Sequence, residues 1–173
     1  HLEAYLKLMQ ARECSNPVTR EANLSHRKMA EEAITLDPRC AVAYLILSAT
    51  HLRDLFFGWS ESPEQSLRLA EELVKKGFAI DDSLGMAHAY LGRIYLTKKQ
   101  HDQAIAEGER ALTLSPNDDF VQAAYAISLY YAGRIEEAIT LYRKAIRLNP
   151  FPPVWYLWGL GSCYRDLGRY EEA

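Results

Sequence analysis

Long apolar runs, basic clusters and paired cysteines are all scarce in this chain of 173 residues. No apolar stretch approaches the roughly 18 to 20 residues that a bilayer-spanning helix needs, so we expect no membrane segment. No run of lysine or arginine exceeds two residues and the formal net charge is −3, which argues against nucleic acid as a partner. A basic, then apolar leader is also lacking, and the expected location is the cytoplasm.

Cysteine and histidine are too dispersed to suggest chemistry. Cys14, Cys40 and Cys163 are odd in number and lie outside any C-x-x-C pair, which favours reduced thiols in a cytoplasmic setting over a disulfide framework. His51 and His88 could approach one another, but no third Cys, His or Asp stands at a ligand spacing. We therefore expect no metal, no cofactor and no catalytic residue, and we interpret the histidines as structural or surface residues.

The chain does contain a repeated short sequence motif, whose copies end at Pro38, Asp82, Pro116 and Pro150. The last three ends are 34 residues apart, a period typical of a two-helix repeat that buries its apolar face only by stacking on copies of itself. Alignment backward from these ends predicts repeats that start near residues 7, 41, 85, 119 and 154. The fifth repeat is expected to stop inside its second helix.

Small residues recur where the two helices of a pair need close backbone approach. They are Gly92, Ala126 and Gly161 on the first helices and Ala104, Ala138 and Ala173 on the second helices. Gly133 and Gly168 stand where a first helix must end, at a position that favours left-handed backbone. Asn117-Asp118-Asp119 supplies a capping start for the next helix.

The third and fourth repeats also carry a known pattern. The tetratricopeptide repeat has Leu-Gly, Tyr, Ala, Ala and Pro at fixed places, which the third repeat fills with Leu91-Gly92, Tyr95, Ala104, Ala111 and Pro116. The fourth carries Ala126, Gly133, Ala138, Tyr142, Ala145 and Pro150. The chain thus resembles a tetratricopeptide-repeat protein. The resemblance implies an all-α, right-handed superhelical solenoid of antiparallel helix pairs, with about four and a half repeats in a single array over residues 1–173.

Two features depart from the pattern. The second repeat is longer than the others through an insertion at residues 55–64, which we expect to be a loop that carries three aromatic residues. Ser62 and Pro63 are suited to the start of the helix that follows it. Gly77 and Gly108 lie inside second helices, where each costs roughly 1 kcal/mol relative to alanine. A bulky neighbour that presses close to each glycine would explain them.

The resemblance also implies a ligand-facing surface on the first helix of each pair. Transfer by register gives a candidate groove of Met86, Tyr90, Arg93, Phe120, Ile127, Tyr130, Tyr131, Trp155, Trp158 and Arg165. The family's clamp for a peptide carboxylate, built from Lys and Asn, is not present at these places. Instead Arg93 and Arg165 stand as isolated cations among aromatics, and these residue types are enriched in binding hot spots. Packing between neighbouring helices is an equally open interpretation.

The expected function is a non-enzymatic protein–protein interaction module that binds a peptide or helix in this groove. Its partner would be a protein, a peptide or another domain of the parent chain. The alternative is a self-association domain, with a homodimer formed through the C-terminal edge at Trp155, Leu157, Leu160 and Tyr164. The opening Ala4–Arg12 segment and the lengthened second repeat resemble the C-terminal arrays of bacterial cyclase-like or winged-helix regulatory proteins, which implies a signalling scaffold.

Overall fold

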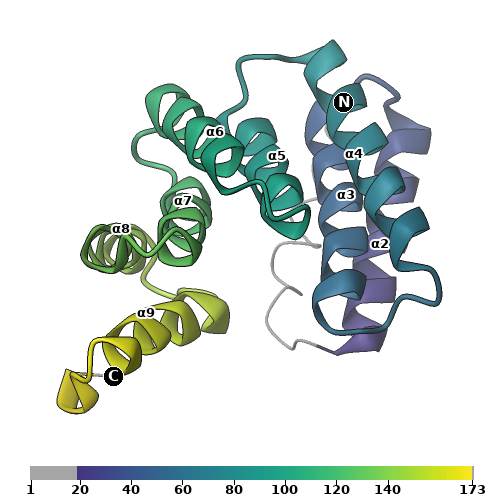
Figure 1. Cartoon of the computed structure of the whole chain (residues 1–173). Coiled ribbons are helices and arrows are strands. Elements are labelled where there is room, and N and C mark those ends of the chain that lie inside the picture. Colours follow the sequence, from purple (N-terminus) through teal and green to yellow (C-terminus); the bar gives the residue numbers. More distant parts are fainter. Residues whose placement is uncertain (1–18, 173) are drawn as a thin grey trace. The chain divides into compact units, whose positions relative to one another are not determined.

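The regular elements of the described residues are helices, and the chain divides into two compact units. The computed structural model describes residues 19–172 (Figure 1), and the units are His1–Ser83 and Leu84–Ala173. Every regular element of the described residues is helical, which confirms the all-α prediction. The predicted repeat start near residue 7 lies outside the described residues, as do Cys14 and Ala173. Between residues 19 and 172, no helix has the length and apolar character required to cross a bilayer.

The first unit contains α2 (Arg20–Leu36), α3 (Ala41–Phe56) and α4 (Pro63–Ile80), and α3 packs against both of the others (Figure 1). Its apolar core is made by small side chains of α2 against larger ones of α3 and α4, namely Ala30, Ala33, Ala43, Ile46, Leu47 and Leu73. The two alanines of α2 let the backbones approach closely.

The lengthening of the second repeat is partly helical. The α3 helix has 16 residues and α4 has 18, whereas α5 has 13 and α6 has 14. Within the expected insertion at 55–64, α3 continues to Phe56 and α4 begins at Pro63. Ser62 occupies the N-cap position of α4, but its hydroxyl makes no capping hydrogen bond, contrary to our expectation. The insertion therefore extends the helical pair as well as its loop.

The second unit contains α5 (Gly85–Thr97), α6 (His101–Leu114), α7 (Asp119–Tyr131), α8 (Ile135–Leu148), α9 (Val154–Asp166) and the short 3-10 helix η1 (Tyr170–Glu172). Its pairs are α5 with α6 and α7 with α8, and α7 also contacts α5, α6 and α9 (Figure 1). The first helices α5, α7 and α9 begin at the expected starts of the third, fourth and fifth repeats. The core combines the rings of Tyr125, Tyr142 and Tyr156 with small residues.

Buried alanines and glycines allow the close packing of these helices. Ala104, Ala126 and Ala138 are each 0% exposed, as their predicted places at helix crossings require. Gly133 and Gly168 have φ values of +78° and +71°, which confirms the predicted left-handed helix ends.

The structure also identifies the bulky neighbours of the two glycines inside second helices. A Cβ atom at Gly77 would lie 2.8 Å from Cδ2 of Leu45. At Gly108 it would overlap Cδ2 of the Tyr125 ring and lie 2.8 Å from Cγ. At Gly108 any larger residue would displace the buried Tyr125 ring, whereas at Gly77 the displacement would fall on the end of the Leu45 side chain.

Candidate functional site

All ten predicted groove residues lie on the first helices of the second unit. Met86, Tyr90 and Arg93 are on α5, whereas Phe120, Ile127, Tyr130 and Tyr131 are on α7, and Trp155, Trp158 and Arg165 are on α9. They do not form one uniform surface. Ile127, Tyr130 and Trp155 are partly buried and pack against the core of the unit, so internal packing accounts for part of the set.

Four of these residues form a continuous group, which we call the Arg93 cluster: Tyr90, Arg93, Phe120 and Trp155. The ring centroids of Tyr90 and Phe120 are 4.8 Å apart, and those of Phe120 and Trp155 are 6.2 Å apart with near-perpendicular planes. Cζ of Arg93 lies 6.0 Å from the Trp155 ring centroid, within the range of a cation–π contact. The cluster therefore joins side chains from the first helices of three successive repeats.

Arg93 carries a charge among phenolic side chains. Its side chain is half-buried, and its electrostatic partners within residues 19–172 are the tyrosines Tyr90, Tyr142 and Tyr156, with no carboxylate among them. Burial lowers the pKa of the Arg93 guanidinium. Burial also raises the pKa of Tyr142 and of Tyr156, so both are neutral phenols at physiological pH. A cation held among neutral rings favours the approach of an anion.

The Trp155 side of the cluster is positioned by a carboxylate that stands in the sequence among the expected capping residues of α7. Tyr156, next to Trp155 and in edge contact with its ring, donates a hydrogen bond to Oδ2 of Asp119 at 2.9 Å. The side-chain amide of Asn149 donates to the same oxygen at 2.8 Å. The capping role belongs to Asp118, which accepts from the Val121 backbone N–H at 2.9 Å. Asp119 thus ties α9 to the start of α7, and no sequence signal distinguished it from its neighbour.

A second, more exposed group lies at the other end of α7. Tyr130 donates a hydrogen bond to Oδ2 of Asp166 at 2.6 Å, and Nε of Arg165 contacts Oδ1 at 3.0 Å. Arg165 is therefore not the isolated cation that the sequence suggested, because its own neighbour in the chain pairs with it. The hydrogen bonds from Tyr130 and Arg165 lower the pKa of Asp166. Tyr131 packs edge-on against Tyr130 and is itself 57% exposed.

The predicted C-terminal edge is only partly uncovered. Leu157 is 48% exposed and Trp158 is 55% exposed. Tyr164, which the sequence placed on the same edge, is 2% exposed and belongs to the apolar core of the unit, and the guanidinium groups of Arg143 and Arg169 lie 5.6 and 5.2 Å from its ring centroid. Tyr164 therefore contributes to packing, and the exposed edge is confined to residues nearer the start of α9.

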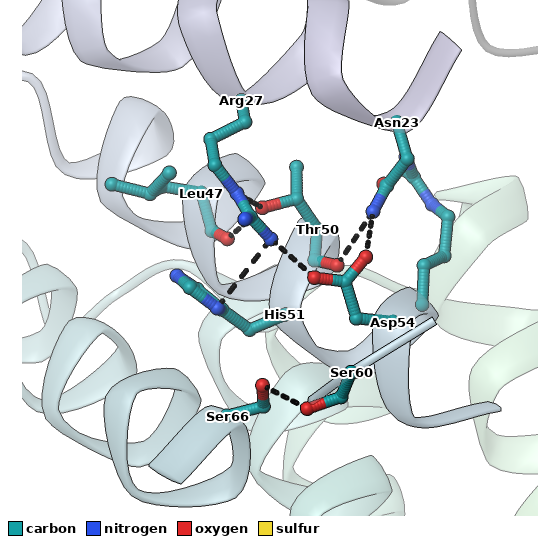
Figure 2. Close-up of polar contacts among 9 residues, drawn as sticks. Asn23, Arg27, Leu47, Thr50, His51, Asp54, Ser60 and Ser66 are labelled. Carbon is teal, nitrogen blue, oxygen red and sulfur yellow. Dashed lines mark hydrogen bonds and ion pairs between the residues drawn. The ribbon is translucent and has the colours of Figure 1, made fainter. Parts of the chain in front are cut away.

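The first unit contains a polar network that joins α2 to α3, shown in Figure 2. Asp54 accepts hydrogen bonds from the Asn23 amide and from Nη2 of Arg27, both at 2.7 Å. Nε of Arg27 donates to the Thr50 hydroxyl at 3.2 Å, and Asn23 also donates to the Thr50 carbonyl at 2.9 Å. Burial, and then the charge of Arg27, lower the pKa of His51 beside this network. Since Arg27 and Asp54 satisfy one another, we interpret the network as structural.

His88 also has a structural partner. His88 lies 2.6 Å from Oε2 of Glu107, whose other oxygen is 2.9 Å from Nη1 of Arg110. His51 belongs to the first unit and His88 to the second. Over residues 19–172, no three His, Cys, Asp or Glu side chains gather in a group that could hold a metal ion.

Comparison with protein families places these helices in context. The family model described as Tetratricopeptide repeat matches residues 85–118, and a second model of the same description matches residues 124–173. The chain contains tetratricopeptide repeats. The matches cover α5, α9 and α7 from residue 124 onward, so Tyr90, Arg93 and Trp155 lie within them, whereas Phe120 lies between them.

Solved structures of tetratricopeptide-repeat proteins share the fold. TTC0263, a thermophilic TPR protein in Thermus thermophilus, has a TM-score of 0.64 at 20% identity, over 82% of this chain and 72% of that one. YrrB, also a TPR protein, has a TM-score of 0.52 at 18% identity, over 98% of this chain and 76% of that one.

Sequence relatives come from larger eukaryotic proteins. The Peroxisomal targeting signal receptor of Saccharomyces cerevisiae is 26% identical over 206 residues, which cover the whole of this chain and 32% of the receptor. The Outer dynein arm-docking complex subunit 4 of Danio rerio is 29% identical over 126 residues, or 64% of this chain and 26% of that protein. This chain thus spans about a third of the length of the receptor.

Proposed function

We propose that this tetratricopeptide array is a non-enzymatic module that binds a peptide or a helix of another protein on the inner face of its second unit. The observation that carries the proposal is the Arg93 cluster, in which three aromatic rings and a half-buried cation join α5, α7 and α9. Aromatic residues and arginine are the types that dominate binding energy at protein interfaces. A surface made from three repeats can contact an extended ligand along its length.

The comparisons support this class of function. A sequence relative is named as a receptor for a peroxisomal targeting signal, and the similar structure YrrB is described as having an unusual peptide-binding site. The tetratricopeptide repeats found here belong to a fold that generally serves protein interaction. The exposed Tyr131 and Trp158 would extend the contact surface beyond the cluster itself.

Self-association is a second candidate function. Leu157 and Trp158 on α9 are both about half exposed, and Tyr170 beyond them is 72% exposed. Large apolar side chains exposed in one region are typical of an interaction surface. If a second copy covers this edge, the molar mass measured by light scattering will double with concentration, and Leu157→Glu will return the protein to a monomer.

A peptide selection tests the main proposal. Binders to the protein would be selected from a displayed library of random decapeptides, and their affinities measured for the wild type, Phe120→Ala and Trp155→Ala. Because truncation of an aromatic anchor costs about 2 kcal/mol or more, we expect a loss of affinity of about 30-fold in each variant.

The control is Glu136→Ala, an exposed residue of α8, which should leave the affinity unchanged. Thermal unfolding of each variant would show that the fold is retained. Equal affinity in all four proteins would place the binding site away from the Arg93 cluster. A selection that yields no binder would remove the proposal altogether.

A further inference from the structure

We infer that the loop between α3 and α4 binds an arginine side chain of another protein. The residues that form this site are Phe56, Phe57, Trp59 and Glu61, which we call the aromatic loop. They belong to the first unit and to the insertion that lengthens the second repeat. The inference therefore goes beyond the proposed function, which uses residues of the second unit alone.

The three rings of the aromatic loop form one group. The centroids of Phe57 and Trp59 are 4.7 Å apart in a stacked arrangement, and those of Phe56 and Phe57 are 4.9 Å apart with near-perpendicular planes. Phe56 is 69% exposed, whereas Phe57 and Trp59 are half-buried. A single exposed apolar side chain is ordinary, but adjoining rings that are left in contact with water are typical of an interaction surface.

The backbone of the loop is fixed before any ligand arrives. The N–H groups of Trp59 and Ser60 both donate to the carbonyl oxygen of Asp54, at 2.8 and 3.2 Å. Gly58 has a φ of +69°, the left-handed conformation that glycine adopts most readily. The Ser60 hydroxyl lies 2.8 Å from the hydroxyl of Ser66 on α4 (Figure 2). A ligand therefore finds the rings on a preformed loop and loses little free energy in ordering it.

The charge of the loop indicates a cationic partner. Residues 57–62 include Glu61, which is exposed, and no lysine or arginine. The corresponding turns of the second unit, residues 98–100, 132–134 and 167–169, each have a basic residue, no acid and no aromatic ring. The loop thus differs from these turns in the sign of its charge and in its rings. Both differences favour a cation, which is attracted to ring faces and to a carboxylate.

Arginine fits both parts of the loop better than lysine does. Its planar guanidinium stacks on an aromatic ring and has further donors in its plane for the two oxygens of a carboxylate. The chain itself contains contacts of the first type. Cζ of Arg93 lies 6.0 Å from the ring centroid of Trp155, and Cζ of Arg169 lies 5.2 Å from that of Tyr164. In the aromatic loop the guanidinium would come from the partner, with Glu61 as its acid.

Mutual packing of the rings, with no ligand, is the competing interpretation. It is tested by thermal unfolding of Phe56→Ser, for which we expect an unchanged midpoint because Phe56 is largely exposed. The matched control is Phe57→Ser, which removes the ring that contacts both of the others and should lower the midpoint. A fall for Phe56→Ser as large as that for Phe57→Ser would make Phe56 a packing residue and overturn the inference.

The binding test uses a displayed library of random decapeptides with one fixed arginine. Peptides that bind the wild type are collected, and those that also bind the double variant Phe56→Ala/Trp59→Ala are discarded. The fixed arginine of each remaining peptide is then replaced by citrulline, which has a similar shape and no charge. We expect citrulline to weaken binding to the wild type about tenfold, since a cation–π contact and an ion pair are both lost.

Glu61→Gln identifies the acid. This variant should bind the arginine peptides about threefold more weakly, and the effect of citrulline should be smaller in it than in the wild type. Glu136→Gln, at an exposed acid of α8, and Trp155→Ala, in the Arg93 cluster, should leave the affinity unchanged.

Three results would overturn the inference. The first is that no peptide remains after the double variant has been used to discard binders. The second is equal affinity for the arginine and citrulline peptides. The third is sedimentation of the wild type, but not of the double variant, with phosphatidylcholine vesicles, which would assign the rings to a lipid surface. None of these results bears on the proposed function, which the Phe120→Ala and Trp155→Ala variants test.

Discussion

Gly108 offers a sharp test of the packing between α6 and α7. In an open helix, Gly108→Ala would stabilise the protein by about 1 kcal/mol, because alanine has the better helix propensity. In this structure the new Cβ would overlap Cδ2 of Tyr125 and lie 2.8 and 2.9 Å from Cγ and Cε2. The ring is 7% exposed and cannot swing into solvent, so α7 must move away from α6.

The cost of overpacking and the gain in helix propensity together give the expected change in the free energy of unfolding. Overpacking of a buried site costs about 1 to 3 kcal/mol. A contact with three ring atoms falls at the upper end, so the net loss after the gain in propensity is about 1 to 2 kcal/mol. For a chain of this length, that corresponds to a fall in the thermal midpoint of about 2 to 8 °C. Thermal unfolding by circular dichroism would measure it.

A second variant tests whether the contact with the Tyr125 ring causes the loss of stability in Gly108→Ala. In a Tyr125→Leu background the ring is absent, and Gly108→Ala should become stabilising by about 1 kcal/mol. Ala106→Gly, at an exposed position of α6, would calibrate the propensity of that helix. If Gly108→Ala raises the thermal midpoint of the otherwise native protein, the ring contact does not limit the packing and the reasoning fails.

Three further predictions concern other sites. Ala138→Leu should cost about 1 to 3 kcal/mol in urea unfolding, because Ala138 is fully buried where α7 and α8 pack together, and an unchanged midpoint would contradict this. Since burial lowers the pKa of His51 below 6.5, its contribution to stability is fully present above pH 6.5 and is lost as the pH falls toward the folded value. His51→Gln should therefore reduce the loss of stability on acidification below pH 6.5; an identical pH profile would refute it. Burial raises the pKa of Cys163 to about 11, so iodoacetamide at pH 8 should modify Cys40 before Cys163, as peptide mass mapping would show.

The helical architecture was predictable because its causes are local. A period of 34 residues, left-handed glycines at 133 and 168, and small residues at helix crossings each reflect a requirement of one helical pair. The need for a bulky neighbour at Gly77 and Gly108 could be stated from sequence. The identity of that neighbour could not be predicted. Leu45 and Tyr125 lie on other helices, and the repeat period does not give their sequence separation from the glycines.

The candidate site was predictable as a set of positions but not as a set of contacts. Register placed Tyr90, Arg93, Phe120 and Trp155 on first helices, and the structure brings these four together. The repeat alignment treated Arg93 and Arg165 alike, although Arg165 pairs with Asp166 whereas the electrostatic partners of Arg93 within residues 19–172 are tyrosines. Charge pairing depends on rotamers and on distances across repeats, and a repeat alignment contains neither.

The α2–α3 contact divides into two halves of different chemistry. Toward the C-terminal end of α2, Ala30 and Ala33 are buried in an apolar core, whereas toward its N-terminal end the contact consists largely of the hydrogen bonds from Asn23 and Arg27 to Asp54 and Thr50. When the first turns of α2 fray, water can replace the partners of these polar groups, and little apolar area becomes exposed. Partial opening at this end therefore gives other chains little surface on which to aggregate.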